Sequence, residues 1–194
     1  ALANDLETAL NIAAACLNLQ IQFGLVRESA AWADQLIVAA RQRTSDSRVA
    51  WRVYLHQGSV SRSVATHPGE DRRQRLVEAL PAYDDSLNAA SPLTSPERHA
   101  NSQIGRGNIL SALATLPGED RRQRLDAALA AYDDALRFIR PDNAPLDYAQ
   151  TQNNRANILS ELATLPGEDR RQRLDDALAA YDDALRFIRP DNAP

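Results

Sequence analysis

The C-terminal part of the chain carries apolar residues at alternating steps of three and four. This spacing places the apolar side chains on one stripe of an α-helix, and the charged residues between them, such as Asp182 and Asp183, fall outside it. The pattern therefore predicts an amphipathic helix. Its apolar stripe consists of Leu174, Ala177, Leu178, Tyr181, Ala184, Leu185 and Ile188.

A Pro-Gly step, Pro166 and Gly167, separates this helix from a preceding one. Proline cannot continue a helix, and glycine readily adopts the left-handed conformation that ends one. Asp169, with Gln172 three positions later, forms a capping-box pattern that predicts the start of the second helix. We therefore expect an antiparallel pair of helices, the first of them over residues 146–165.

This helix pair recurs with a period of 49 residues. Residues 114–145 and 163–194 differ at one position in 32, where Ala127 is replaced by Asp176. A repeat of this length indicates stacked supersecondary units rather than one closed core. The period therefore predicts an all-α fold, an α-solenoid of about four antiparallel helix pairs in a single array. The expected units cover approximately residues 1–45, 46–94, 95–143 and 144–194.

The same period places the other helices. Ser95 followed by Pro96 is typical of an N-cap with proline at the first helical position. Pro81 falls inside a predicted second helix, which it should kink or locally open. The other expected helices span residues 3–22, 26–43, 46–66, 70–89, 95–116 and 119–139.

Each second helix in three of the units carries a small residue, a tyrosine four positions on, another small residue and a closing proline. With a small residue in each first helix, this arrangement resembles the tetratricopeptide repeat over nearly the whole chain. The unit is longer than the family's 34 residues because both helices extend around the Pro-Gly turn. The matching residues are Ala177, Tyr181, Ala184 and Pro190; Ala128, Tyr132, Ala135 and Pro141; Ala79, Tyr83, Ser86 and Pro92; and, in the first helices, Ala156, Gly107, Gly58 and Ala13.

One departure from the family concerns the position before the small residue of the first helix. Where the family usually has a buried leucine, this chain has Arg155 and Arg106. Burying an unpaired arginine costs several kcal/mol. We therefore expect both side chains to be partly buried and paired with carboxylates. The candidate partners are Asp133, Asp134, Asp182 and Asp183.

The resemblance also implies that the first helices line the concave face of a right-handed superhelix. On this chain that face would carry mainly amide and hydroxyl side chains, which can bond to the backbone of an extended peptide whatever its sequence. In a second interpretation, compatible with the first, the amides bridge neighbouring first helices and hold the stack together. The expected partner-binding residues are Arg52, Asn101, Asn108, Ser111, Gln150, Asn153, Asn157 and Ser160.

An Arg-Arg-Gln-Arg segment recurs at residues 72–75, 121–124 and 170–173 and would form an arginine stripe along the array. Such a stripe could meet an anionic partner. Acidic residues lie within helical reach, however, and we expect i,i+4 ion pairs from Arg122 to Asp126 and from Arg171 to Asp175. The pattern therefore favours a solvated face with local and inter-unit ion pairs.

Residues that carry chemistry are sparse. Cys16 is the single cysteine, which excludes an intrachain disulfide and a cysteine-based zinc site, and the histidines at 56, 67 and 99 lack metal-ligand spacing. The sequence shows no nucleophile–base pairing and no phosphate-cradling glycine loop. It therefore predicts a protein that is not an enzyme and has no catalytic residue, metal site or cofactor.

The longest uncharged run, residues 8–26, contains several amides, and its apolar residues follow helical spacing, which favours a buried helix over a membrane span. We therefore expect a cytoplasmic, non-catalytic protein–protein interaction scaffold. It would bind a protein or peptide on its concave face as the sensor or regulatory segment of a larger bacterial protein.

Two alternative functions remain. The first is nucleic-acid binding through the arginine stripe, which a net charge of −4 and an aromatic content of 5% disfavour. The second is a self-assembling array that forms a homo-oligomer through its ends, because each terminal helix pair presents a face without a neighbouring unit.

Overall fold

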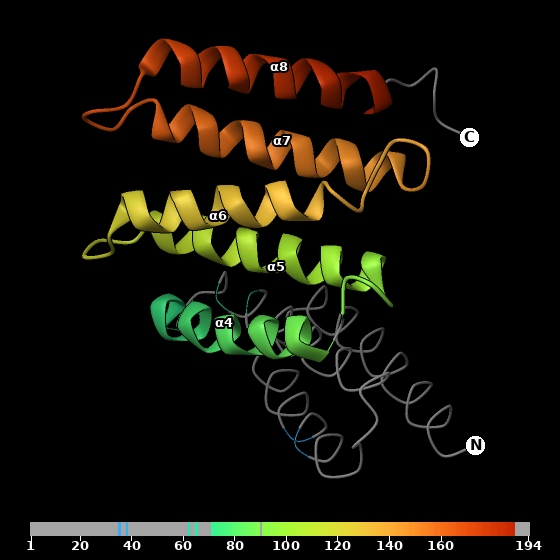
Figure 1. The fold of residues 1–194 in the computed structure, drawn as a ribbon. Helices are drawn as coiled ribbons and strands as arrows, with labels where there is room; N and C mark the ends of the chain where they lie inside the picture. Colours follow the sequence, from blue (N-terminus) through green and yellow to red (C-terminus); the bar gives the residue numbers. More distant parts are fainter. Residues whose placement is uncertain are drawn as a thin grey trace, which may run out of the picture. The chain divides into compact units, whose positions relative to one another are not determined.

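The computed structural model describes residues 71–89 and 91–188, together with the single positions 35, 38, 62 and 65. Over the two continuous stretches every regular element is a helix, so the predicted all-α class is confirmed there (Figure 1). The helices expected within residues 3–66 lie outside the continuous stretches. The helices are α4 (Arg72–Ala89), α5 (Pro96–Ala114), α6 (Arg121–Ala135), α7 (Pro145–Leu162) and α8 (Arg170–Ile188).

The chain divides into two compact units, residues 1–105 and 106–194, and the division falls inside α5. In the first unit the described part comprises α4 and the N-terminal half of α5. Pro81 lies inside α4, and the helix continues through it. The second unit contains the rest of α5 with α6, α7 and α8.

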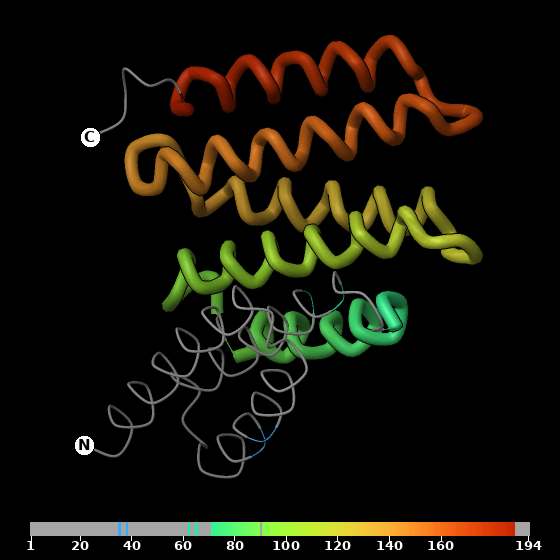
Figure 2. Tube along the Cα trace, turned by 180° about the vertical axis from the view of Figure 1, so that it is seen from behind, coloured from blue at the N-terminus to red at the C-terminus, as the bar shows by residue number. Residues whose placement is uncertain are grey.

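Within the second unit, α7 lies between α6 and α8 and contacts both (Figures 1 and 2). Ala156 and Leu159 of α7 are buried against Ala177 and Ala180 of α8. Leu129 of α6 packs against this same cluster. Because α7 packs against both α6 and α8, the core continues from α6 to α8 and is not confined to one helix pair.

The Pro-Gly turns between helices take the conformation that the sequence predicts. Gly118 and Gly167 both have φ 81°, in the left-handed region where a side chain would be strained. After the second turn, the Asp169 carboxylate accepts a hydrogen bond from the backbone N–H of Gln172 at 3.1 Å, so the predicted N-cap is present. The Gln172 side chain donates forward to Asp176 rather than back to the cap, so the capping box is only half formed.

The expected helix bounds shift by up to four residues, and two helices end at least three residues before the predicted end. The helix expected to end at residue 139 stops at Ala135, and the one expected to end at residue 165 stops at Leu162. In both places the backbone tightens into i→i+3 bonds, such as Phe138 N–H to the Ala135 carbonyl at 3.0 Å. Such a turn keeps the apolar periodicity, and Ile139 remains buried with 4% of its surface exposed. The pattern of apolar residues therefore continues after the α-helix has ended.

In each unit, a buried tyrosine ring packs directly against a glycine of α5. A Cβ atom on Gly105 would lie 2.0 Å from Tyr83 Cε1 in the first unit. In the second unit, a Cβ atom on Gly107 would lie 2.7 Å from Tyr132 Cε1. Both distances are too short for any other residue without displacement of the ring. Tyr83 and Tyr132 therefore belong to the core, and they are 1% and 2% exposed.

Candidate partner-binding surface

Three of the expected partner-binding residues share one exposed stripe of α7. Gln150, Asn153 and Asn157 follow each other at steps of three and four, and all three are exposed. The Asn157 Oδ1 atom accepts a hydrogen bond from the Tyr181 hydroxyl, and its amide nitrogen has no partner among the described residues. These residues form a row of donors and acceptors, which we call the amide stripe.

The other expected residues are placed differently. Ser160 of α7 and Ser111 of α5 are half-buried in the second unit. Asn101 is exposed and belongs to the first unit, and Arg52 lies outside the described residues. The structure therefore brings the amide stripe together on one helix and leaves a continuous binding face over several first helices as a prediction.

Asn108 holds helices together. Its Oδ1 atom accepts hydrogen bonds from the Tyr132 hydroxyl at 2.7 Å and from the Asn154 amide at 3.2 Å. These bonds connect α5 to α6 and α5 to α7 within the second unit. At this position the interpretation that amides bridge neighbouring first helices is confirmed. Asn154 was not among the expected site residues, although it belongs to a run of asparagines that a helix does not favour.

Arg155 is accommodated by an ion pair between α6 and α7. Its Nε donates to the Asp133 carboxylate at 2.5 Å, and its side chain is 28% exposed. The prediction that this arginine is partly buried and paired with one of the named carboxylates is confirmed. Arg106, in the equivalent position of α5, is half-buried as well.

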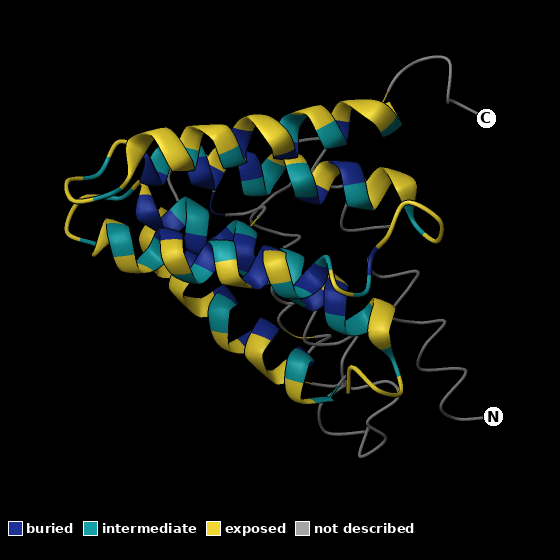
Figure 3. Cartoon of the chain, turned by 45° about the horizontal axis from the view of Figure 1, so that its top comes forward, coloured by how far each residue is buried: buried dark blue, intermediate teal, exposed yellow. Residues whose placement is uncertain are grey.

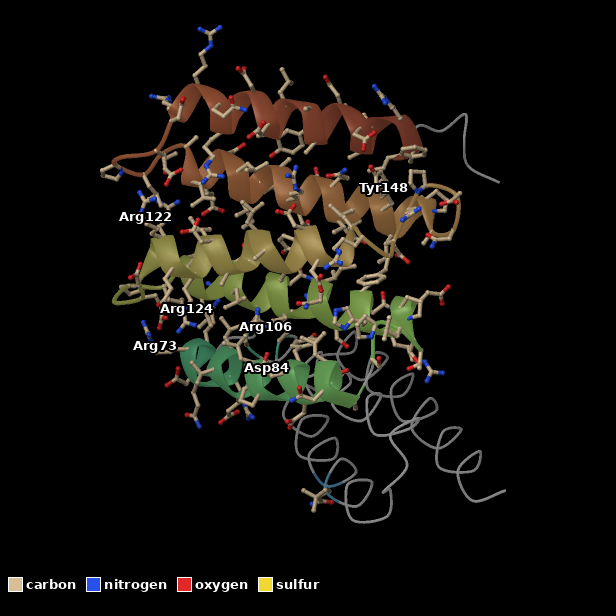
Figure 4. The ribbon with its side chains drawn as sticks, in the orientation of Figure 1. Arg73, Asp84, Arg106, Arg122, Arg124 and Tyr148 are labelled. Atoms are coloured by element: carbon tan, nitrogen blue, oxygen red, sulfur yellow. The ribbon has the colours of Figure 1, made fainter. Side chains whose placement is uncertain are left out.

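The arginines that begin α6 also reach to the following helix pair (Figure 4). Arg121 donates to Glu161 of α7 at 3.1 Å. Arg122 pairs with Glu168 in the turn before α8 and donates to the Pro166 carbonyl. The prediction of a local pair between Arg122 and Asp126 is therefore wrong, because the long side chain reaches a better-enclosed carboxylate in the next helix pair.

Glu168 receives two arginines. Arg173 donates to it at 2.8 Å, and Arg122 binds its other oxygen. These two hydrogen bonds lower the pKa of Glu168 below its ordinary value. The charge-paired carboxylate fixes the turn between α7 and α8 to the start of α6. By contrast, the expected i,i+4 pair from Arg171 to Asp175 is present but loose, at 3.9 Å and largely in solvent.

A cavity of about 330 Å³ opens between α7 and α8. Beside it, the Asp183 carboxylate accepts hydrogen bonds from the Tyr148 hydroxyl and from the Gln152 amide, the latter at 3.1 Å. Burial and the Asp183 hydrogen bond raise the pKa of Tyr148, which therefore stays protonated. Sequence reasoning missed this groove, although Asp176, the one residue that differs between segments 114–145 and 163–194, lies in it. Its lining consists of Gln152, Arg155, Asp176, Ala179, Ala180, Asp183 and Arg186.

Comparison with known proteins gave no match among family models, curated proteins or solved structures. Among the described residues, no group of three or more histidine, cysteine, aspartate or glutamate side chains could hold a metal ion. In the same part of the chain no helix is both long and apolar enough to cross a membrane.

Proposed function

We propose that the chain is a non-catalytic protein-interaction module, built as the tetratricopeptide resemblance implies, that binds an extended peptide along the amide stripe. In this proposal the helix pairs stack as a right-handed α-solenoid, the first helices line its concave face, and the module works in the cytoplasm of a bacterium as part of a larger protein. The observation that carries the proposal is the amide stripe on α7.

The polar groups of the stripe differ from those elsewhere on the second unit. Gln150 and Asn153 make no side-chain hydrogen bond among the described residues, whereas Asn108 and Asn154 are bonded to each other. An unbonded amide can donate to a peptide carbonyl and accept from a peptide N–H. Hydrogen bonds from an amide to a peptide backbone do not depend on the side chains of the peptide. They therefore suit a partner that is recognised mainly by its extended backbone.

The arginine stripe supports peptide binding over nucleic-acid binding. Arg121, Arg122 and Arg124 of α6 are each paired with a glutamate of the same unit. A phosphate backbone would have to displace these carboxylates before it could neutralise the arginines. These three arginines of α6 are therefore neutralised by ion pairs that stabilise the fold.

A displayed library of random peptides tests this proposal. We expect the parent chain to enrich peptides with little side-chain preference. The double variant Gln150→Ala with Asn153→Ala should bind them about thirtyfold more weakly, because it loses two hydrogen bonds worth about 1 kcal/mol each. Both side chains are exposed, so the melting temperature should stay close to that of the parent chain.

Gln123→Ala supplies the matched control. Gln123 is an exposed amide on α6, away from the stripe, and only its backbone N–H is used in a cap. This variant should bind peptides as the parent chain does. Equal binding by the parent chain and the double variant would overturn the proposal, and so would a parent chain that enriches no peptide at all.

A further inference from the structure

The helices α6 and α8 have nearly the same sequence but are covered to different extents. In α6, Leu125 is 0% exposed, whereas its counterpart in α8, Leu174, is 42% exposed. Beyond the end of α6, Ile139 is 4% exposed, and its counterpart Ile188 is 52% exposed. Since α6 is followed by α7, which packs on it, the difference reflects the cover that α7 provides (Figure 3).

The charged residues show the same contrast. Asp133 of α6 binds Arg155 of α7, whereas the equivalent Asp182 of α8 is exposed and makes no hydrogen bond or ion pair among the described residues. Arg121 of α6 reaches Glu161 of α7, whereas the equivalent Arg170 of α8 is exposed and has no such partner in the described part of the chain.

Arg122 and Arg171 complete the comparison. Arg122 is 41% exposed and held by Glu168 and the Pro166 carbonyl, whereas Arg171 is 92% exposed with only a 3.9 Å approach to Asp175. An α8 helix that met an α7-like neighbour would therefore gain the same three ion pairs. The positive start of α8 and its acidic C-terminal half are complementary to a helix that, like α7, has an arginine near its middle, one glutamate at its end and another in the turn that follows.

We propose that the open side of α8 is a docking surface for the first helix of a further 49-residue unit with the sequence of residues 146–194. That helix would lie on α8 as α7 lies on α6, with its own arginine on Asp182 and its glutamates on Arg170 and Arg171. Its apolar side chains would cover the large hydrophobic residues that α8 exposes. This surface, the α8 face, consists of Arg170, Arg171, Leu174, Leu178, Asp182, Leu185 and Ile188.

The kind of helix that would bind the α8 face can be inferred from the interface between α6 and α7. Leu129 of α6 packs against Ala156 and Leu159 of the next pair, and Leu178, its counterpart, is 60% exposed. A surface whose apolar and charged positions both repeat those of an existing interface fits the same kind of helix. The proposal is independent of the amide stripe, because no residue of the α8 face belongs to that stripe.

The probe is a fluorescent peptide of residues 145–169, cross-linked between positions 148 and 152 so that it is helical. In the parent chain Tyr148 and Gln152 both contact Asp183 of α8 in their own pair, so the link leaves Ala156 and Leu159 free to meet the α8 face. Fluorescence anisotropy then measures its binding to the full chain. We expect binding to the parent chain and at least about tenfold weaker binding to Asp182→Arg.

A charge exchange makes the test specific. The same peptide carrying Arg155→Asp should bind the Asp182→Arg chain and recover most of the lost affinity. The matched control is Asp175→Arg, because Asp175 is equally acidic and exposed on α8 while its counterpart Asp126 makes no ion pair with α7. This control should bind the parent peptide normally.

Three outcomes would overturn the proposal. A peptide that circular dichroism shows to be helical could fail to bind, or Asp175→Arg could weaken binding as much as Asp182→Arg. The chain could also form a peptide-independent dimer that Leu178→Asp abolishes, which would assign the α8 face to a second copy of the chain instead. Circular dichroism of each chain variant establishes that it remains folded.

Discussion

Asn108 and Asn157 occupy the same position in successive copies of the repeat, and both accept a hydrogen bond from the tyrosine of their own helix pair. Asn108 accepts a second bond from Asn154 on the following first helix and is half-buried. Asn157 is exposed and has no second partner among the described residues. The same residue in equivalent positions therefore either connects two helix pairs, as Asn108 does, or lies on the surface, as Asn157 does. The difference depends on whether a following helix covers it.

The same division extends to the apolar and charged residues of α6 and α8. On α6, which α7 covers, the repeated residues are buried or form ion pairs. On α8 the equivalent residues are exposed, and they present the same apolar and charged groups that bind a helix on α6. Because the two copies are nearly identical in sequence, paired substitutions in α6 and α8 can separate the effect of the neighbour from the effect of the residue.

The largest expected difference concerns the first leucine of each second helix. Leu125→Ala should lower the free energy of unfolding by about 3 kcal/mol, because a fully buried side chain leaves a cavity. Leu174→Ala should cost less than about 1 kcal/mol, because Leu174 is already 42% exposed. Urea denaturation followed by circular dichroism measures both. Equal losses would show that α7 does not provide the cover that distinguishes the two helices.

A smaller difference is expected for the two asparagines. Asn108→Ala should destabilise the chain by about 1–2 kcal/mol, because it removes two hydrogen bonds that connect three helices at a half-buried position. Asn157→Ala should cost about 0.5 kcal/mol, because its single bond is exposed to water. Thermal melts of the two variants beside the parent chain test this order, and a larger loss from Asn157→Ala would contradict it.

Much of the fold could be predicted because it rests on local chemistry. Gly118 and Gly167 adopt the left-handed conformation that their position after proline indicates, and Asp169 caps the next helix. The pairing of Arg155 with Asp133 was also predictable, since a partly buried guanidinium needs a carboxylate and the repeat supplied the register.

The missed features depend on distances between helices. Arg122 could reach Asp126 on its own helix or Glu168 in the next helix pair, and only the packing of α6 against α7 decides for Glu168. The groove beside Tyr148 and Asp183 likewise arises where α7 and α8 meet. The sequence periodicity specifies which face of each helix is buried, but not how far apart two helices lie.

The smallest expected effect is a difference in acid sensitivity between Arg122→Gln and Arg171→Gln. The pKa of Glu168 is lowered in the folded chain by hydrogen bonds from Arg173 and Arg122. A lowered pKa in the folded state stabilises the fold above the pKa of the unfolded state, and this contribution is lost as the pH falls through the folded value. Arg122→Gln should therefore make stability fall less steeply with pH below the ordinary pKa of glutamate. Arg171→Gln should leave this pH dependence as in the parent chain, because Arg171 does not contact Glu168.

Urea midpoints measured between pH 7 and pH 3 on the parent chain and the two variants give this comparison. Three parallel curves would show that the inter-unit ion pair adds nothing to the acid response and that Arg173 alone determines the state of Glu168.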